Sequence, residues 1–392
     1  MPPVRIQVKP DIIDWALTRS GHSVELLEKF PGIPLWKSGE RLPTINQLEK
    51  FASASYTPFG YFFLDSAPVD KLPIPDFRTV ADKEVTRPSP NLIDTVHMME
   101  RRQEWLSEYL QSQGEPENDF VGWISGPTAD TATIENYAQA MREALGLRVD
   151  WAYECRNWTE ALGFLRTNVE AKGVAVVSNG IVGNNTHRTL DPSEFRGFVL
   201  VDRYAPLVFL NGADSKSAQM FTLAHEIAHV CLGASAAFDL KNLDPADDQK
   251  EKFCNQLAAE FLVPRTQILS IWKDHTGSQY VDFEGLAQQF KVSQLVIARR
   301  ASDLGLIPKE LYYAFYKNYM SAEHIKASTT ESTGGDFYRT QNQRIGRLFA
   351  RTVLYAIDSG SLSYDEAYRL TGLSGATFHK FAEKMRETSE QG

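Results

Sequence analysis

Two histidines and a glutamate near the middle of the chain have the spacing of a metal site. They occur as His225-Glu226-Ile-Ala-His229 in the run Gln219–Leu232, which lacks proline and glycine, so we expect a helix that ends at Gly233. Residues four apart share one helix face, so both imidazoles could ligate one Zn²⁺. The ion would lower the pKa of a bound water, and Glu226 could take its proton as hydroxide attacks a carbonyl. The spacing therefore predicts metal-assisted hydrolysis.

The alternative for these histidines is simple packing inside the protein. Their neighbours are largely apolar, which indicates a helix buried on most of its circumference; they are Leu223, Ala224, Ile227, Ala228 and Val230. A buried imidazole needs a polar partner, and a metal ion is a good one. We therefore favour metal binding.

A third ligand is expected, because two histidines alone make a weak site. A second predicted helix, which Pro264 ends, carries Glu251 and, four residues later on the same face, Asn255. Glu251 would complete a His₂Glu set, and Asn255 would accept a hydrogen bond from the ring N–H of a ligand histidine. Glu260 is nine residues from Glu251 and faces nearly the opposite way, so only one of them can point at the metal. The polar partner at Asn255 favours Glu251; further candidates are Cys254, Asp244, Asp247 and Asp248.

Three short runs before the histidines predict a small buried sheet. They are rich in β-branched and aromatic residues, and they span residues 173–177, 198–201 and 207–210. Before and after them the apolar residues follow a helical period, so the central region combines helices with few strands.

The motif and its spacing resemble a known family. The string HEIAH, followed 22 residues later by E-x-x-C-N-x-x-A-A-E-F-L-V-P, is similar to the ImmA/IrrE family of zinc peptidases, a gluzincin-like group, over residues 170–310. The resemblance implies that His225, His229 and Glu251 bind zinc. It also implies that Glu226 is the general base. A thermolysin-like arrangement would follow, with a sheet whose edge strand could hold an extended peptide.

Residues 10–64 predict short helices and resemble a helix-turn-helix domain of the Xre/Cro type. The resemblance is carried by the run from Trp36 to Thr44, W-K-S-G-E-R-L-P-T, and by the helix predicted after it. Such a domain would place a short helix in the major groove of DNA. The segment in the recognition position, 30–36, holds two prolines and few polar groups, so only Lys37 and Arg41 are near enough to contact DNA. A helical protein-interaction domain is the alternative.

Two later segments have a similar helix-turn-helix rhythm. Residues 286–305 contain the basic pair Arg299-Arg300, but the same element is usual near the end of the peptidase family's domain, so we expect a structural role. Residues 364–380 follow a basic helix predicted over 339–351 and could bind DNA or a protein partner.

The expected fold class is α+β, with a central gluzincin-like zinc peptidase domain around a small β-sheet. Proline-rich runs near 72–76 and 87–90 indicate linker edges, and residues 328–336 indicate a loop. The predicted domains are an all-α Xre/Cro-like helix-turn-helix domain (1–72), a helical linker region (73–170), the peptidase domain (171–317) and a helical C-terminal module (318–392).

Composition excludes several classes of protein. The 392 residues are 43% hydrophobic and 23% charged, as in globular proteins, and no run of about 18 apolar residues suggests a membrane span. The start lacks an apolar signal segment, and three cysteines cannot form a disulfide framework, so we expect a cytoplasmic protein with Cys231 and Cys254 in its core. The net charge of −9 lies entirely within residues 76–317, so strong non-specific nucleic-acid binding is disfavoured.

Two functional hypotheses follow. The first is a cytoplasmic zinc endopeptidase that cleaves one regulatory protein, in a layout that resembles bacterial regulators encoded beside a toxin or a phage-response gene. The second is a binding protein, an antitoxin or transcription regulator that binds a toxin or promoter DNA, with a structural or sensory zinc site. The expected partners are a protein substrate or cognate toxin, promoter DNA at the N-terminal domain, no membrane, and a second copy of the chain, since Xre-like domains often pair.

Overall fold

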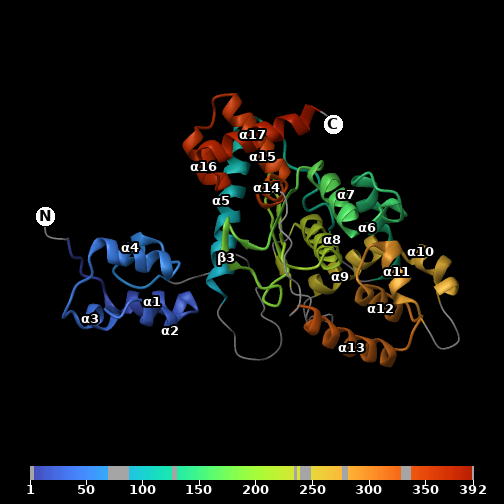
Figure 1. Ribbon diagram of the computed structural model, residues 1–392. Helices are drawn as coiled ribbons and strands as arrows, with labels where there is room; N and C mark the ends of the chain where they lie inside the picture. Colours follow the sequence, from blue (N-terminus) through green and yellow to red (C-terminus); the bar gives the residue numbers. More distant parts are fainter. Residues whose placement is uncertain are drawn as a thin grey trace. The chain divides into compact units, whose positions relative to one another are not determined.

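A computed structural model describes residues 4–68, 88–125, 130–233, 236–238, 249–275, 281–327 and 337–390 (Figure 1). The described residues fall into two compact units. The first contains those up to 68 together with residues 88–97, and the second contains those from 98 onward. Among the described residues, no helix is long and apolar enough to cross a membrane.

The first unit is a small helical bundle. Its core contains Ile12, Leu48, Phe51 and Phe62, all at most 1% exposed. Thr44 caps the helix that follows it in a reciprocal capping box with Gln47. The elements are α1 (Pro10–Ser20), α2 (Ser23–Lys29), α3 (Ile33–Ser38), α4 (Ile45–Ala54) and the 3₁₀ helix η1 (Phe59–Phe63).

Helix α3 overlaps residues 30–36, the segment that the resemblance places in the recognition position. It forms in the segment with two prolines because Pro34 stands in its first turn, where a backbone N–H has no helical partner anyway. Trp36 then lies buried and packs edge-on against Phe51. The segment is therefore held by apolar contacts within the bundle.

The second unit is built around a four-stranded sheet with the order β1-β5-β4-β6. β1 and β5 are parallel, and β4 is antiparallel to both of its neighbours. The three predicted strands are confirmed as β1 (Ala175–Asn179), β4 (Gly197–Leu200) and β5 (Leu207–Asn211). Three short strands were not predicted: β6 (Ala236–Phe238) and the hairpin of β2 (Ile181–Val182) and β3 (Asn185–Thr189).

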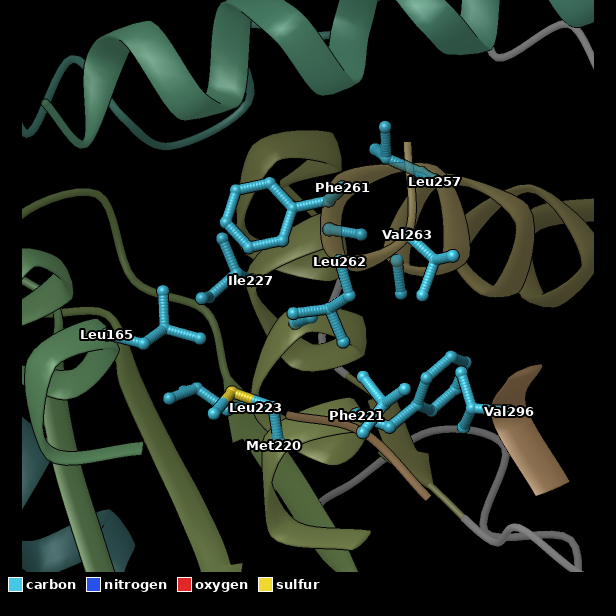
Figure 2. Close-up of a cluster of buried hydrophobic side chains, with 14 of the residues drawn as sticks. Leu165, Met220, Phe221, Leu223, Ile227, Leu257, Phe261, Leu262, Val263 and Val296 are labelled. Carbon is cyan, nitrogen blue, oxygen red and sulfur yellow. The ribbon is translucent and has the colours of Figure 1, made fainter. Parts of the chain in front are cut away.

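Helices cover the sheet and share its core. Figure 2 shows the centre of this core, where Phe221, Leu223 and Ile227 meet apolar side chains of three other helices. These include Leu165 and Phe261, both fully buried. The helices are α7 (Trp158–Glu170), α8 (Lys216–Leu232), α9 (Gln249–Leu262) and α12 (Gln294–Asp303).

The remaining helices of the second unit surround this core. α6 packs along α9, and α11 forms with α12 the helix-turn-helix shape predicted over 286–305. Its basic pair is engaged internally, because Arg299 pairs with Asp303 and Arg300 with Glu260, so a structural role is supported. The elements are α5 (Pro90–Ser112, whose first residues belong to the first unit), α6 (Thr131–Ala144), η2 (Trp151–Glu154), α10 (Arg265–Ile271), η4 (Trp272–His275), α11 (Phe283–Phe290) and α13 (Lys309–Ala327).

Four helices at the C-terminal end group together (Figure 1). The single basic helix predicted over 339–351 is wrong, because Gly346 divides it with a φ of +89°. A Cβ on Gly346 would lie 3.2 Å from the carbonyl oxygen of Val176, so this glycine lets the helices approach β1 closely. The helices are α14 (Phe337–Ile345), α15 (Arg347–Asp358), α16 (Tyr364–Thr371) and α17 (Gly375–Glu390).

Candidate metal centre

Helix α8 carries both histidines and Glu226 into the interior of the second unit. The Ser215 hydroxyl caps its first turn, and Gly233 ends it in the left-handed conformation, as predicted. Nearly every residue from Ala218 to Cys231 is buried, so helix formation and core packing act together on this segment. His225 and Glu226 are 0% exposed and His229 is 2% exposed.

Helix α9 brings Glu251 to the two imidazoles. The Glu251 carboxylate lies 3.3 Å from His225 Nε2 and 3.1 Å from His229 Nε2. The two Nε2 atoms are 3.0 Å apart, and the three potential ligand atoms all lie within 4.8 Å of one another. Three ligand atoms from two helices therefore converge on one point, as the sequence predicts.

The geometry fits a zinc ion. Zinc–nitrogen bonds of about 2.0–2.1 Å at tetrahedral angles place two nitrogens about 3.3 Å apart, close to the separation of the two imidazoles. Two histidines and one carboxylate also match the ligand types that zinc takes in hydrolytic sites. Three protein ligands leave a fourth position open for water or a carbonyl oxygen.

The surroundings of Glu226 also favour a hydrolytic metal site. Both of its carboxylate oxygens are buried and have no hydrogen-bond partner. Such orphaned acceptors are costly unless a water or an ion satisfies them. Burial, assisted by the negative charge of Glu251, raises the pKa of Glu226 well above its usual value. The carboxylate therefore has a strong affinity for a proton, which is the property of a general base.

The electrostatics of the ligand set also favour metal binding. Burial lowers the pKa of His225 to about 4, so its imidazole is neutral near pH 7 and can offer a lone pair. Burial acts to raise the pKa of Glu251, but hydrogen bonds to His225 and His229 outweigh it and hold the pKa far below its usual range. A neutral imidazole and an ionised carboxylate are the forms that a cation needs.

Asn255 lies one turn after Glu251 on α9. It lies near enough to the His225 side chain to favour the protonated ring, but its buried Oδ1 accepts no hydrogen bond. This is the neighbour that sequence reasoning expected beside a ligand histidine, where it would orient the ring.

The structure separates Glu260 from the metal ligands. Its Oε1 accepts a hydrogen bond from the backbone N–H of Arg265, and its Oε2 pairs with the buried Arg300. Cys254 and Cys231 are both 0% exposed within the apolar core, as expected. Asp244, Asp247 and Asp248 lie outside the described residues.

One residue beside the site was not predicted. Gly197 of β4 faces α8, and a Cβ placed on it would lie 3.6 Å from Glu226 Oε1 and 2.5 Å from Thr222 Cγ2. A glycine inside a strand is a sequence signal for close backbone approach, but nothing local says what approaches.

The two residues considered for DNA contact lie in the first unit. The Lys37 ammonium pairs with Asp14 of α1 at 2.6 Å, and Arg41 is exposed in the segment after α3. Exposed side chains of α2 and α3 include the apolar Val24, Leu27 and Leu35. Base readout needs polar groups that reach base edges, so DNA binding by this unit stays a prediction.

Two segments of the chain match known family models. Residues 169–302 match the family model described as the IrrE N-terminal-like domain, and residues 345–384 match a domain of unknown function (DUF8813). No curated protein matches the chain. The first match includes both histidines, Glu226 and Glu251, and it indicates a metallopeptidase domain of the ImmA/IrrE type, a family that is typically zinc-dependent.

Proposed function

We propose that this protein is a zinc-dependent endopeptidase in which His225, His229 and Glu251 bind the metal and Glu226 is the general base. The observation that carries the proposal is the convergence of the three ligand atoms within 4.8 Å beside a buried carboxylate with no partner. The family match over residues 169–302 supports the same reaction class.

The roles of the side chains follow from their surroundings. Zinc at this point would supply a Lewis acid that activates water and polarises the scissile carbonyl. Glu226 takes the proton of the attacking water, because burial has raised its proton affinity, and then passes that proton to the leaving amine. Asn255, which lies near the His225 side chain, would orient its ring by accepting the Nδ1–H.

The test compares metal content and cleavage in matched variants. The wild-type protein should contain about one zinc per chain. His225→Ala should lose it, whereas Glu226→Gln should keep the zinc and cleave β-casein at least about a hundredfold more slowly. Elemental analysis and the cleavage rate report the two effects separately. A Glu226→Gln protein that cleaves as fast as wild type contradicts the assigned base, and a wild type that binds no zinc contradicts the whole site.

We further propose that the natural substrate is one protein partner, of a regulatory kind, and not polypeptides in general. The supporting observation is burial: His225 and Glu226 are 0% exposed, so an unselected chain such as β-casein should reach the general base only slowly, whereas a partner that opens the site should be cleaved faster. In cells that express the protein, mass spectrometry of new N-termini should find one or a few cleavage sites that are absent with Glu226→Gln. Many unrelated sites would contradict a dedicated substrate.

A further inference from the structure

The strand β6 is the outer neighbour of the strand that covers Glu226. β4 pairs with β5 along one edge and with β6 along the other. β4 also rests on α8 at the general base, as the close approach of Gly197 to Glu226 shows. β6 itself contacts α8. Its register with β4 is Gly197↔Phe238, Phe198↔Ala237 and Val199↔Ala236.

The edge of β4 that β6 occupies is the edge that a peptide substrate would need. A polypeptide that is recognised through its backbone adds to a strand edge and fills its N–H and C=O groups. β5 already takes the other edge of β4. A substrate strand that binds beside Glu226 therefore competes with β6 for the same edge of β4.

The side chains of the candidate metal site are also largely shielded from solvent. His225 and Glu226 are 0% exposed and His229 is 2% exposed, so only the Glu251 side chain, at 28%, reaches solvent. A scissile bond can meet Glu226 only after some element has moved.

β6 is the element best suited to move. It is three residues long, and within the described part of the chain it pairs with β4 alone. The ligand-bearing segments of α8 and α9 are instead fixed in the main apolar core. Short pairings at the edge of a sheet belong to the least stable parts of a fold.

We propose that β6 is a built-in substitute for the substrate: it holds the β4 edge in the free protein, and an extended polypeptide displaces it to reach Glu226. The inference rests on the proposed peptidase function and specifies the substrate as a segment of at least three residues that can adopt an extended backbone. Because one strand replaces another, activity depends on how firmly β6 is held.

Two proline substitutions in β6 provide a matched pair for the test. Successive N–H groups of a strand point to opposite edges, so one of Ala236→Pro and Ala237→Pro removes a donor to β4, and the other removes a donor that points away from the sheet. Amide hydrogen exchange of Gly197–Leu200 identifies the inward variant as the one in which these amides exchange faster. Both variants are made in the full-length, zinc-loaded protein.

The readouts are the rate of zinc loss to excess EDTA and the rate of β-casein cleavage. The inward proline should raise both rates at least fivefold, and the outward proline should leave both unchanged. A disulfide between Val199→Cys and Ala236→Cys, which are paired residues, should lower both rates until a phosphine reductant restores them.

Two results would overturn the inference. Unchanged zinc loss in the inward variant overturns the inference, whatever the cleavage rate. Slower cleavage by the outward variant also overturns it, because the peptide then adds to the free edge of β6 itself. Failure of the proposed function looks different, since in that case no version of the protein binds zinc or cleaves.

Discussion

Gly197 of β4 lies beside the carboxylate of Glu226 on α8, where even a Cβ atom on this residue would come within 3.6 Å of Oε1. A Cβ on this glycine would meet the Phe209 carbonyl oxygen at 2.8 Å and Thr222 Cγ2 at 2.5 Å, with Glu226 Oε1 at 3.6 Å. Both distances below 3 Å are shorter than real Cβ contacts, so strand and helix can approach this closely only because residue 197 has no side chain. The close approach of β4 therefore sets the position of Glu226, the proposed general base, relative to the sheet.

Replacement of Gly197 by alanine should weaken both the fold and the reaction. The methyl group forces Thr222 and the turn of α8 that carries Glu226 away from β4, at a cost of about 1–3 kcal/mol in the free energy of unfolding. Cleavage should fall further than the folded fraction does, while zinc content stays at the wild-type level. Gly163→Ala in α7 is the control, since nothing lies within 4 Å of a Cβ there. Equal effects of the two substitutions in urea unfolding and cleavage assays would contradict the prediction.

The helix that carries His225 and His229 could be predicted because its signals are local. The spacing of His225 and His229, the stop at Gly233 and the apolar neighbours all lie within one short run. The choice of Glu251 over Glu260 needed the helical phase and the polar partner Asn255, and the structure places the two carboxylates on different partners. Gly197 could not be assigned in the same way, because its role depends on a strand and a helix that meet only in the folded chain.

The missed elements are those whose causes are non-local. β6 has three residues, too few for a periodic pattern, and pairing with β4 defines it. β3, with the sequence Asn-Thr-His-Arg-Thr, is polar and largely exposed, so it lacks the apolar pattern of a buried strand. Gly346 has a helical sequence on both sides, and the close approach to Val176 explains why the chain bends there.

Arg102 should anchor the C-terminal helices to α5. Its guanidinium is 4% exposed and donates to the Leu370 carbonyl at 2.9 Å and the Arg344 carbonyl at 3.0 Å, while it lies over the Phe349 ring. Arg102→Met removes the donors to these partly buried carbonyls, so we expect a loss of roughly 2–4 kcal/mol in stability. Faster amide exchange in α14 and α16 should accompany it.

The neighbouring Arg101 offers the matched control for this prediction. It lies on the same helix and is exposed, so Arg101→Met should change neither urea unfolding nor exchange measurably. If the two methionine variants behave alike, Arg102 is not the anchor.

Glu170 should make stability depend on pH. It accepts hydrogen bonds from the Arg347 and Leu348 N–H groups at the start of α15, and burial raises its pKa above the ordinary 4.5. In the unfolded chain it loses its proton near pH 4.5, whereas the folded chain holds that proton to higher pH, so its contribution to stability falls as pH rises above about 4.5. Glu170→Gln removes this titration and keeps an acceptor for α15. The stability of wild type relative to this variant should therefore decline between pH 4.5 and 7 in urea unfolding.

Glu160 on the same helix is the control with the opposite sign. A hydrogen bond from Arg156 lowers the pKa of Glu160. The stability of wild type relative to Glu160→Gln should therefore increase, and not decrease, as the pH rises toward the ordinary pKa of 4.5. A decline with pH for both variants would show that the slope does not come from Glu170.

Glu251 and Glu260, on one helix, should respond oppositely to the same substitution. Glu251→Gln removes a proposed ligand, so zinc content should fall well below one per chain. Glu260→Gln should retain zinc but lose about 3–5 kcal/mol of stability, because Arg300 is left buried without its charged partner. A double substitution that also replaces Arg300 by methionine should recover part of this loss, which separates the broken pair from general damage. Elemental analysis beside urea unfolding measures both effects, and loss of zinc from a folded Glu260→Gln protein would reverse the assignment of the third ligand.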